Sequence, residues 1–245
     1  MTTETYRTRI YNHYVHSRDC PLAPTSLDGL RPRAPLLRRL VQRHFPADKN
    51  AAVLDLGCGH GTLLHFARQL GYRNALGVDG SPEQVAAARH LGIEGVMEGD
   101  LNAMLLAQPD ASLDVVVTFD VIEHFTRNEL LPFVDQVHRV LKPGARWIIH
   151  APNGESPFFG TIRYGDLTHE LAFTRTSLSQ LLLSSGFSDV RCFEDTPVVH
   201  GAKSAVRWAL WQGFRSLLRL YIAAETGDAS NAHIFSQNFL AVATK

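Results

Sequence analysis

The chain has 245 residues, 45% of them apolar, and its 24 basic and 24 acidic residues leave a formal net charge of zero. This length and apolar content suffice for one sizeable hydrophobic core with additions around it. The neutral charge argues against nucleic acid as the main partner, because nucleic-acid binding depends on neutralising phosphates with basic side chains.

Residues 1–50 precede the first predicted strand and are expected to form an N-terminal helical cap. Tyr6, Ile10, Tyr11, Tyr14 and Val15 recur at helical spacing, with arginines and histidines between them. This pattern indicates an amphipathic helix that either packs on the domain or covers a ligand. Prolines interrupt the chain after it, and residues 36–45 are predicted to form a helix that leads into the first strand.

From residue 51 the chain alternates strand patterns with helix patterns, which predicts an α/β domain of parallel strands joined by right-handed crossovers. Strands are expected at 51–56, 75–79, 95–100, 113–119, 147–151, 189–194 and 234–244. Helices are expected at 62–70, from 82 onward, at 128–141, at 176–185 and in an insertion at 200–230.

A glycine-rich turn, Asp55-Leu56-Gly57-Cys58-Gly59-His60-Gly61, joins the first strand to the first helix. Glycines let the backbone adopt positive φ and let a ligand approach it closely, and the free N–H groups of the helix start face the turn. Asp79 and Asp100 end the next two strands, and an acid about 20 residues after such a turn contacts ribose in nucleotide-binding folds. The pattern predicts a nucleoside-containing ligand at this sheet edge.

The same turn resembles the first motif of the class I S-adenosylmethionine-dependent methyltransferases, and the resemblance covers roughly residues 50–150. It implies a Rossmann-like α/β fold, with a mostly parallel seven-stranded sheet, helices on both faces and a final antiparallel strand. It also implies S-adenosylmethionine as cofactor, with Asp79 at the ribose, Asp100 at the adenine amine and Phe119 at the methionine end. The full set of implied cofactor residues is Asp55, Gly57, Gly59, Gly61, Asp79, Asp100, Leu101 and Phe119.

A second group of polar residues, Asp120, Glu123 and His124, directly follows the fourth strand. If residues 120–124 form one helical turn, the spacing i, i+3, i+4 places the three side chains on one face. Two carboxylates and an imidazole then form a plausible divalent-metal site. The alternative is that Glu123 and His124 only stabilise the turn.

The segment also resembles two groups of O-methyltransferases, the metal-dependent enzymes that modify small-RNA 3′ ends and the enzymes of ubiquinone biosynthesis. The resemblance rests on residues 120–124, on Pro152-Asn153 and on His169 before Phe173-Thr174. It implies a loop at 152–175 on the acceptor side, and it makes Glu123, His124 and His169 catalytic. The implied metal ligands are Asp120, Glu123, His124 and His169, with His169 either the fourth ligand or a general base. Asp120 stands where those families mostly have the longer glutamate.

Together these features predict a methyltransferase domain over residues 51–245 that O-methylates a small-molecule or saccharide-like hydroxyl. A divalent metal such as Mg²⁺ or Mn²⁺ would lower the pKa of the hydroxyl, and a histidine would take its proton. Two alternatives stay open: a metal-independent N- or C-methyltransferase of a small metabolite, and an inactive cofactor-binding or scaffold protein. RNA as acceptor is disfavoured by the neutral charge.

The insertion at 200–230 is basic and amphipathic, with seven large apolar residues at Trp208, Trp211, Phe214, Leu217, Leu218, Leu220 and Tyr221. It is expected either to pack on the sheet or on a second subunit, giving a homodimer, or to serve as a lid or a membrane-surface helix.

Cys20, Cys58 and Cys192 lack C-x-x-C spacing and are interpreted as free thiols in a reducing compartment. There is no pattern of a secretory signal, and no apolar run approaches the roughly 18 residues of a membrane-spanning helix. A cytoplasmic location without a transmembrane segment is therefore expected.

Overall fold

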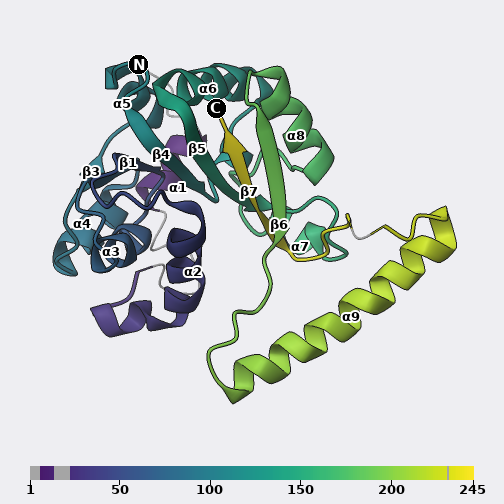
Figure 1. Ribbon diagram of the computed structural model, residues 1–245. Coiled ribbons are helices and arrows are strands. Elements are labelled where there is room, and N and C mark those ends of the chain that lie inside the picture. The colour runs from purple at the N-terminus through teal and green to yellow at the C-terminus, as the bar shows by residue number, and fades with distance from the viewer. Residues whose placement is uncertain (1–5, 14–22, 231) are drawn as a thin grey trace.

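A computed structural model describes residues 6–13, 23–230 and 232–245 (Figure 1). The first half contains α1 (Tyr6–Asn12), the 3₁₀ segment η1 (Leu27–Arg33), α2 (Ala34–His44), β1 (Val53–Leu56), α3 (Thr62–Gln69), β2 (Ala75–Asp79), α4 (Pro82–His90), β3 (Val96–Glu98), α5 (Leu101–Ala107) and β4 (Leu113–Phe119). The second half contains η2 (Ile122–His124), α6 (Arg127–Val140), β5 (Leu141–Pro152), α7 (Phe159–Arg163), α8 (Arg175–Ser184), β6 (Asp189–Glu194), α9 (Ala202–Thr226) and β7 (Asn238–Thr244).

The seven strands form one sheet in the order β3-β2-β1-β4-β5-β7-β6. Strands β1 to β5 pair in parallel, and β7 runs antiparallel to both β5 and β6. The predicted Rossmann-like sheet with a final antiparallel strand is therefore confirmed. Because the strand order reverses between β1 and β4, a crevice forms there at the carboxyl ends of the strands.

Apolar residues fill both faces of the sheet, as the valine- and leucine-rich strands predict. On one face, side chains of β4 and β5 pack beneath α5, α6 and α8, and the fully buried Phe133 and Trp147 belong to this cluster. On the other face, α2, α3 and α4 cover Val53, Val115 and Val117. Two closed faces leave the crevice edge as the place where a ligand can enter.

The region before the sheet contains more than one packed helix. Leu37, Leu40 and Val41 of α2 are buried in the core of the second face. The described part of the first predicted helix is α1, whose Arg7 donates to Glu129 of α6 at 3.0 Å. Tyr14 and Val15 of that prediction lie outside the described residues.

The helical insertion contains α9, a 25-residue helix that stands away from the sheet in Figure 1. Ser204 is its single buried residue. Of the helices in the described ranges, none is both long enough and apolar enough to span a bilayer. The two described cysteines, Cys58 and Cys192, are free thiols, whereas Cys20 lies outside the described residues.

Two boundary predictions were wrong. The last strand was expected to begin at residue 234, but β7 begins at Asn238. The chain at 142–144 was expected to turn before a strand at 147–151, but β5 begins at Leu141 and includes the turn residues. The register shift between Leu113 and Val115 of β4 accommodates them, and Gly144 takes a φ of 76° there. The turn is therefore an irregularity within the strand, since the chain resumes pairing with β4 at Arg146.

Candidate cofactor and metal site

The turn between β1 and α3 has the backbone that its glycines predict. Gly57, Gly59 and Gly61 have φ values of 72°, 55° and 79°. A Cβ on Gly57 would lie 2.4 Å from Cγ2 of Val121, and one on Gly61 would lie 2.6 Å from Cγ2 of Val96. A Cβ on Gly59 would make only ordinary van der Waals contact, 3.7 Å from Oε1 of Gln84, so packing does not require this glycine. Gly57 and Gly61 are therefore needed for packing, and Gly57 and Gly59 border the crevice.

Asp79, at the end of β2, is hydrogen-bonded to this turn. Its carboxylate accepts from the backbone N–H of Gly59 at 2.7 Å and from that of Ser81 at 2.9 Å. Burial raises the pKa of Asp79. Asp100 caps α5 by accepting from the N–H of Ala103 at 2.8 Å. Both acids therefore border the crevice with their positions set by backbone groups.

A cavity of about 950 Å³ occupies this edge of the sheet, within the range of ligand pockets in proteins. Six of the eight predicted cofactor residues line it: Gly57, Gly59, Asp79, Asp100, Leu101 and Phe119. Asp55 and Gly61 do not. Asp55 lies behind the turn with 2% of its surface exposed, and burial, followed by the charge of Asp79, raises its pKa well above the usual value.

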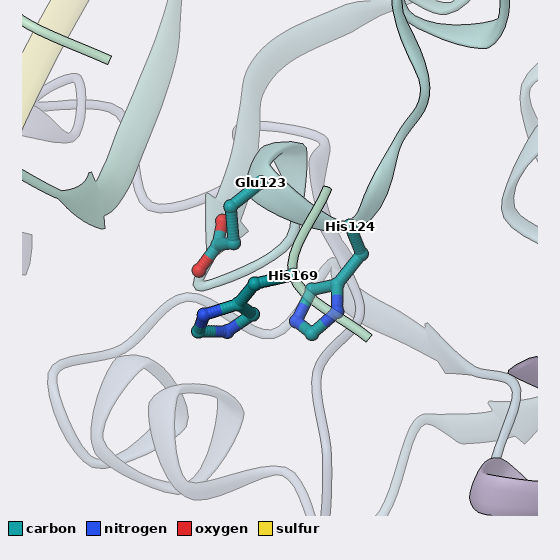
Figure 2. Close-up of side chains that lie close together, drawn as sticks. All are labelled: Glu123, His124 and His169. Carbon is teal, nitrogen blue, oxygen red and sulfur yellow. The ribbon is translucent and has the colours of Figure 1, made fainter. Parts of the chain in front are cut away.

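At the other end of the cavity, Glu123, His124 and His169 form a cluster (Figure 2). Each offers one ligand atom, and these atoms lie within 4.8 Å of one another. Glu123 and His124 come from η2, and His169 comes from the loop after α7. The loop is docked because Glu170 and Leu171 donate their N–H groups to the carbonyl of Glu123 at 2.8 and 2.9 Å. Residues 45 positions apart are thus brought together by two backbone hydrogen bonds.

The hydrogen bonds around the two histidines define which ring nitrogen is free. Thr168 donates its hydroxyl hydrogen to Asp166 at 2.6 Å, so its oxygen accepts from Nδ1 of His124 at 2.9 Å. Nδ1 of His169 donates to the carbonyl of Ile162 at 3.1 Å. Both rings therefore carry their hydrogen on Nδ1 and present an Nε2 lone pair.

Both imidazoles are neutral near pH 7. Burial, followed by the neighbouring His169, lowers the pKa of His124 to about 4. Burial also lowers the pKa of His169. Neutral rings whose second nitrogen is already hydrogen-bonded are the form in which histidine binds a metal ion.

Glu123 is the unusual member of the cluster. Its side chain is 1% exposed, and neither carboxylate oxygen has a hydrogen-bond partner among the described residues. Burial, followed by the charge of Asp120, raises the pKa of Glu123 well above its usual value. Buried carboxylates normally have a hydrogen-bonding or charged partner. The missing partner of Glu123 is therefore the strongest sign that this site binds something.

Asp120 was predicted to share one helical face with Glu123 and His124, and that prediction was wrong. The helical turn covers only Ile122–His124, and Asp120 precedes it with a left-handed φ of 57°. Its carboxylate accepts from Nδ1 of His150 at 2.6 Å, and it is not part of the cluster. A positive φ points the side chain away from the face that a continuous helix would give it.

His150 is a site residue that the sequence did not suggest. It is buried in β5, stacks on Phe119 with ring centroids 3.9 Å apart, and has Nε2 3.6 Å from a carboxylate oxygen of Asp195. Burial alone would lower its pKa, but Asp120, followed by Asp195, outweighs burial and raises the pKa to about 9. A histidine within an apolar strand was the available signal, but its acidic partners lie 30 and 45 positions away.

The described part of α1 borders the cavity as well. Arg7, Tyr11 and Asn12 line it. The ring of Tyr11 lies edge-on to His124 with centroids 6.2 Å apart, and burial raises its pKa to about 12. Of the two hypotheses for this helix, these contacts favour one that covers a ligand.

Comparison with known proteins gives consistent matches. Residues 30–191 match a family model described as a methyltransferase domain. A probable S-adenosylmethionine-dependent methyltransferase of Mycolicibacterium smegmatis is 34% identical over 153 residues, which cover 61% of this chain and 56% of that protein. Norajmaline N-methyltransferase of Rauvolfia serpentina is 36% identical over 110 residues, 42% of this chain and 37% of that protein.

A small RNA 2′-O-methyltransferase of Mus musculus is 31% identical over 159 residues, 58% of this chain and 39% of that protein. The chain thus spans about half, or less, of the length of these curated relatives. Among solved structures, a SAM-dependent methyltransferase from Archaeoglobus fulgidus superposes with a TM-score of 0.64 at 23% identity, covering 89% of this chain and 97% of that one. At that identity the superposition supports the fold alone.

Proposed function

The chain belongs to the class I S-adenosylmethionine-dependent methyltransferases, and from this we propose that it methylates a hydroxyl oxygen with a divalent metal held by Glu123, His124 and His169. The acceptor is a small molecule or a saccharide-like compound. The observation that carries the proposal is the buried Glu123 carboxylate, which has no hydrogen-bond partner among the described residues and lies beside two free imidazole lone pairs.

The cofactor half of the proposal rests on the glycine turn and the two acids that border the cavity. Gly59 lines the cavity and has no Cβ, which suits close approach of a ligand, and the carboxylates of Asp79 and Asp100 suit ribose hydroxyls and an adenine amine. S-adenosylmethionine, the cofactor of the family, would supply an electrophilic methyl group on its sulfonium. The chain would contribute by binding the cofactor and orienting it against the acceptor.

The metal half rests on the donor set. One carboxylate and two neutral imidazoles suit Mn²⁺, Co²⁺ or Zn²⁺ better than Mg²⁺, which prefers oxygen ligands. When bound, such an ion would act as a Lewis acid that lowers the pKa of an acceptor hydroxyl. His124 is held by Thr168 in the orientation this requires, and Thr168 is held in turn by Asp166. His169 has one free lone pair, which in this proposal binds the metal.

The closed setting supports an acceptor of modest size. Tyr11 of α1 and the 152–175 loop border the same cavity as the cluster. Side chains that exclude water around a hydroxyl strengthen its interaction with nearby charges. A formal net charge of zero remains an argument against RNA as acceptor.

Metal binding is tested by titrating Mn²⁺ into chelator-treated protein by calorimetry. We expect binding by the unmodified chain and none by Glu123→Gln, which keeps the size and removes the charge. Glu129→Gln is the matched control, because Glu129 lines the same cavity but is already paired with Arg7.

Activity is tested as release of S-adenosylhomocysteine with panels of hydroxyl and amine acceptors. We expect turnover with a hydroxyl acceptor that excess chelator abolishes and Mn²⁺ restores. Full turnover in excess chelator would refute the metal role, and turnover confined to amines would refute O-methylation. Absence of binding to both S-adenosylmethionine and its demethylated product would instead support an inactive protein.

A metal-independent N-methyltransferase is the second candidate, because the matched Rauvolfia serpentina relative is named an N-methyltransferase. A neutral amine already has a nucleophilic lone pair and needs no metal to lower a pKa. In that case His169→Ala would change turnover only mildly, whereas the metal-assisted proposal expects a loss of at least about 100-fold.

A further inference from the structure

Helix α9 exposes more apolar side chain than any other helix of the described chain. Six of its large apolar residues are each between 58% and 67% exposed: Val206, Leu210, Phe214, Leu217, Leu220 and Tyr221. Apolar patches of this size on a folded chain usually mark an interaction site. Figure 1 shows the helix standing off the sheet, so one of its long sides has no neighbour in the described chain.

Four of these residues, together with the exposed Gly213 and Ala224, follow a regular spacing, and Phe214 and Tyr221 lie beside them. Positions 206, 210, 213, 217, 220 and 224 alternate steps of four and three, the spacing of a seam between two packed helices. Arg215 lies off this seam and forms an ion pair with Glu194 of β6 at 2.7 Å. The half-buried Trp211, Leu218 and Ile222 lie on the same side of the helix as Arg215, so this side faces the domain and the apolar seam faces away from it.

The exposed charges on α9 are separated along its axis, whereas the half-buried Arg215 and Arg219 lie on the side opposite the seam. Lys203 and Arg207 are exposed in the first two turns, and Glu225 is exposed in the last turn. An antiparallel second copy would bring each basic end beside an acidic end and would also oppose the two helix dipoles. An anionic membrane would favour basic residues all along both borders of the apolar face. The distribution fits a copy of the helix better than a lipid surface.

The seam is also self-complementary in shape. In an antiparallel pair with its two-fold axis at the level of Arg215, position 206 meets 224, 210 meets 220 and 213 meets 217. Gly213 and Ala224 then face the larger Leu217 and Val206, so the helices can approach closely. The six exposed side chains offer on the order of 700 Å² per protomer, close to the roughly 800 Å² of a standard interface.

We propose that α9 pairs antiparallel with α9 of a second copy of this chain, so that the protein is a two-fold symmetric dimer. The Arg215–Glu194 ion pair holds each helix to its own domain. The proposal is independent of the methyl acceptor and of any metal.

The oligomeric state is tested by sedimentation of the full chain from low to high micromolar concentration. We expect Leu217→Glu to raise the dimer Kd by at least about 100-fold, since it places a charge in the centre of the seam. Trp208→Glu is the matched control. It introduces the same charge on the same helix, but nine residues are about two and a half turns, so Trp208 lies opposite Leu217. We expect it to change the Kd less than about 3-fold.

Two further experiments test the orientation. Arg207→Glu and Glu225→Arg should each weaken the dimer, and the double variant should recover it. Val206→Cys mixed with Ala224→Cys should be joined by a short bismaleimide. Either variant alone should not be joined, because its two copies lie about 27 Å apart along the antiparallel axes.

Three results would overturn the proposal. The first is a monomer at every concentration, including one that binds anionic vesicles through the seam, which would assign this face to a membrane. The second is a dimer that Leu217→Glu does not weaken, and the third is efficient self-cross-linking of Val206→Cys, which requires parallel helices.

Discussion

The pair formed by His150 and Asp120 makes the stability of the fold depend on pH. His150 is 4% exposed, and its partners raise its pKa to about 9, above the roughly 6.5 expected in the unfolded chain. A group whose pKa is raised on folding stabilises the fold fully below its unfolded pKa and loses that contribution as the pH rises through its folded pKa. We therefore expect the free energy of unfolding to fall between pH 6.5 and 9.

The size of the fall follows from the shift. A difference of two to three pKa units corresponds to about 3 kcal/mol. The Asp120 side chain is 44% exposed to the cavity, so solvent screens part of its attraction for His150. We expect a net loss of about 2 kcal/mol across the interval.

The assay is urea unfolding, followed by circular dichroism, at steps from pH 6 to 10. His150→Gln keeps a hydrogen-bond donor near Asp120 but cannot carry a charge, so its unfolding free energy should vary by less than about 0.5 kcal/mol from this source. The difference between the two proteins isolates His150 from every other group that titrates in the interval.

His233→Gln is the control. His233 forms an ion pair with Asp228 at 3.0 Å, but the two side chains are 27% and 47% exposed, and surface pairs contribute little. It should retain the pH dependence of the unmodified chain. If the unmodified chain and His150→Gln show the same slope between pH 6.5 and 9, then His150 is not a charged partner of Asp120 and the interpretation is incorrect.

Three further predictions address the cofactor turn, the cluster and the core. Gly57→Ala should abolish binding of S-adenosylmethionine measured by calorimetry, because the new Cβ would lie 2.4 Å from Val121 on a backbone with φ of 72°. Unchanged affinity would contradict this packing. Glu123→Gln should raise the melting temperature of chelator-treated protein by about 3 °C, since burial of the Glu123 carboxyl raises its pKa and leaves its oxygens without a hydrogen-bond partner among the described residues. A lower melting temperature would show that this carboxyl stabilises the metal-free fold. Phe133→Ala should lower the free energy of unfolding in urea by about 3–5 kcal/mol, because Phe133 is fully buried. Leu131→Ala should lower it by less than about 0.5 kcal/mol, because Leu131 is 52% exposed. Equal losses would contradict the assignment of the core.

The cofactor end of the site could be predicted because its signals are local. Gly57 and Gly59 lie within one strand-turn-helix unit, Asp79 ends β2, and Asp100 follows β3 as the N-cap of α5. Parallel strands bring their carboxyl ends to one edge, so local patterns were enough to place these residues together. Asp55 belongs to the same motif, but it lies behind the turn and outside the cavity lining.

The metal end could be predicted only in part. Glu123 and His124 are neighbours in sequence, and the resemblance to O-methyltransferases supplied His169 from a loop 45 positions later. Asp120 would share a face with Glu123 and His124 only if its backbone were helical. Its left-handed φ is instead stabilised by His150 of β5. The carbonyl of His150 accepts from the Asp120 N–H, and the ring of His150 donates to the Asp120 carboxylate. No pattern within five residues could contain that information.

Sequence alone therefore predicted the alternation of strands and helices, the glycine turn and the adjacent Glu123-His124 pair, because periodicity and backbone conformation are properties of short segments. Tertiary structure alone decided that Asp120 pairs with His150 and that Glu123 is buried without a hydrogen-bond partner among the described residues. It also decided that α9 lies away from the sheet with its apolar seam exposed. Each of these depends on side chains far apart in sequence whose charges and surfaces meet only after the sheet has formed.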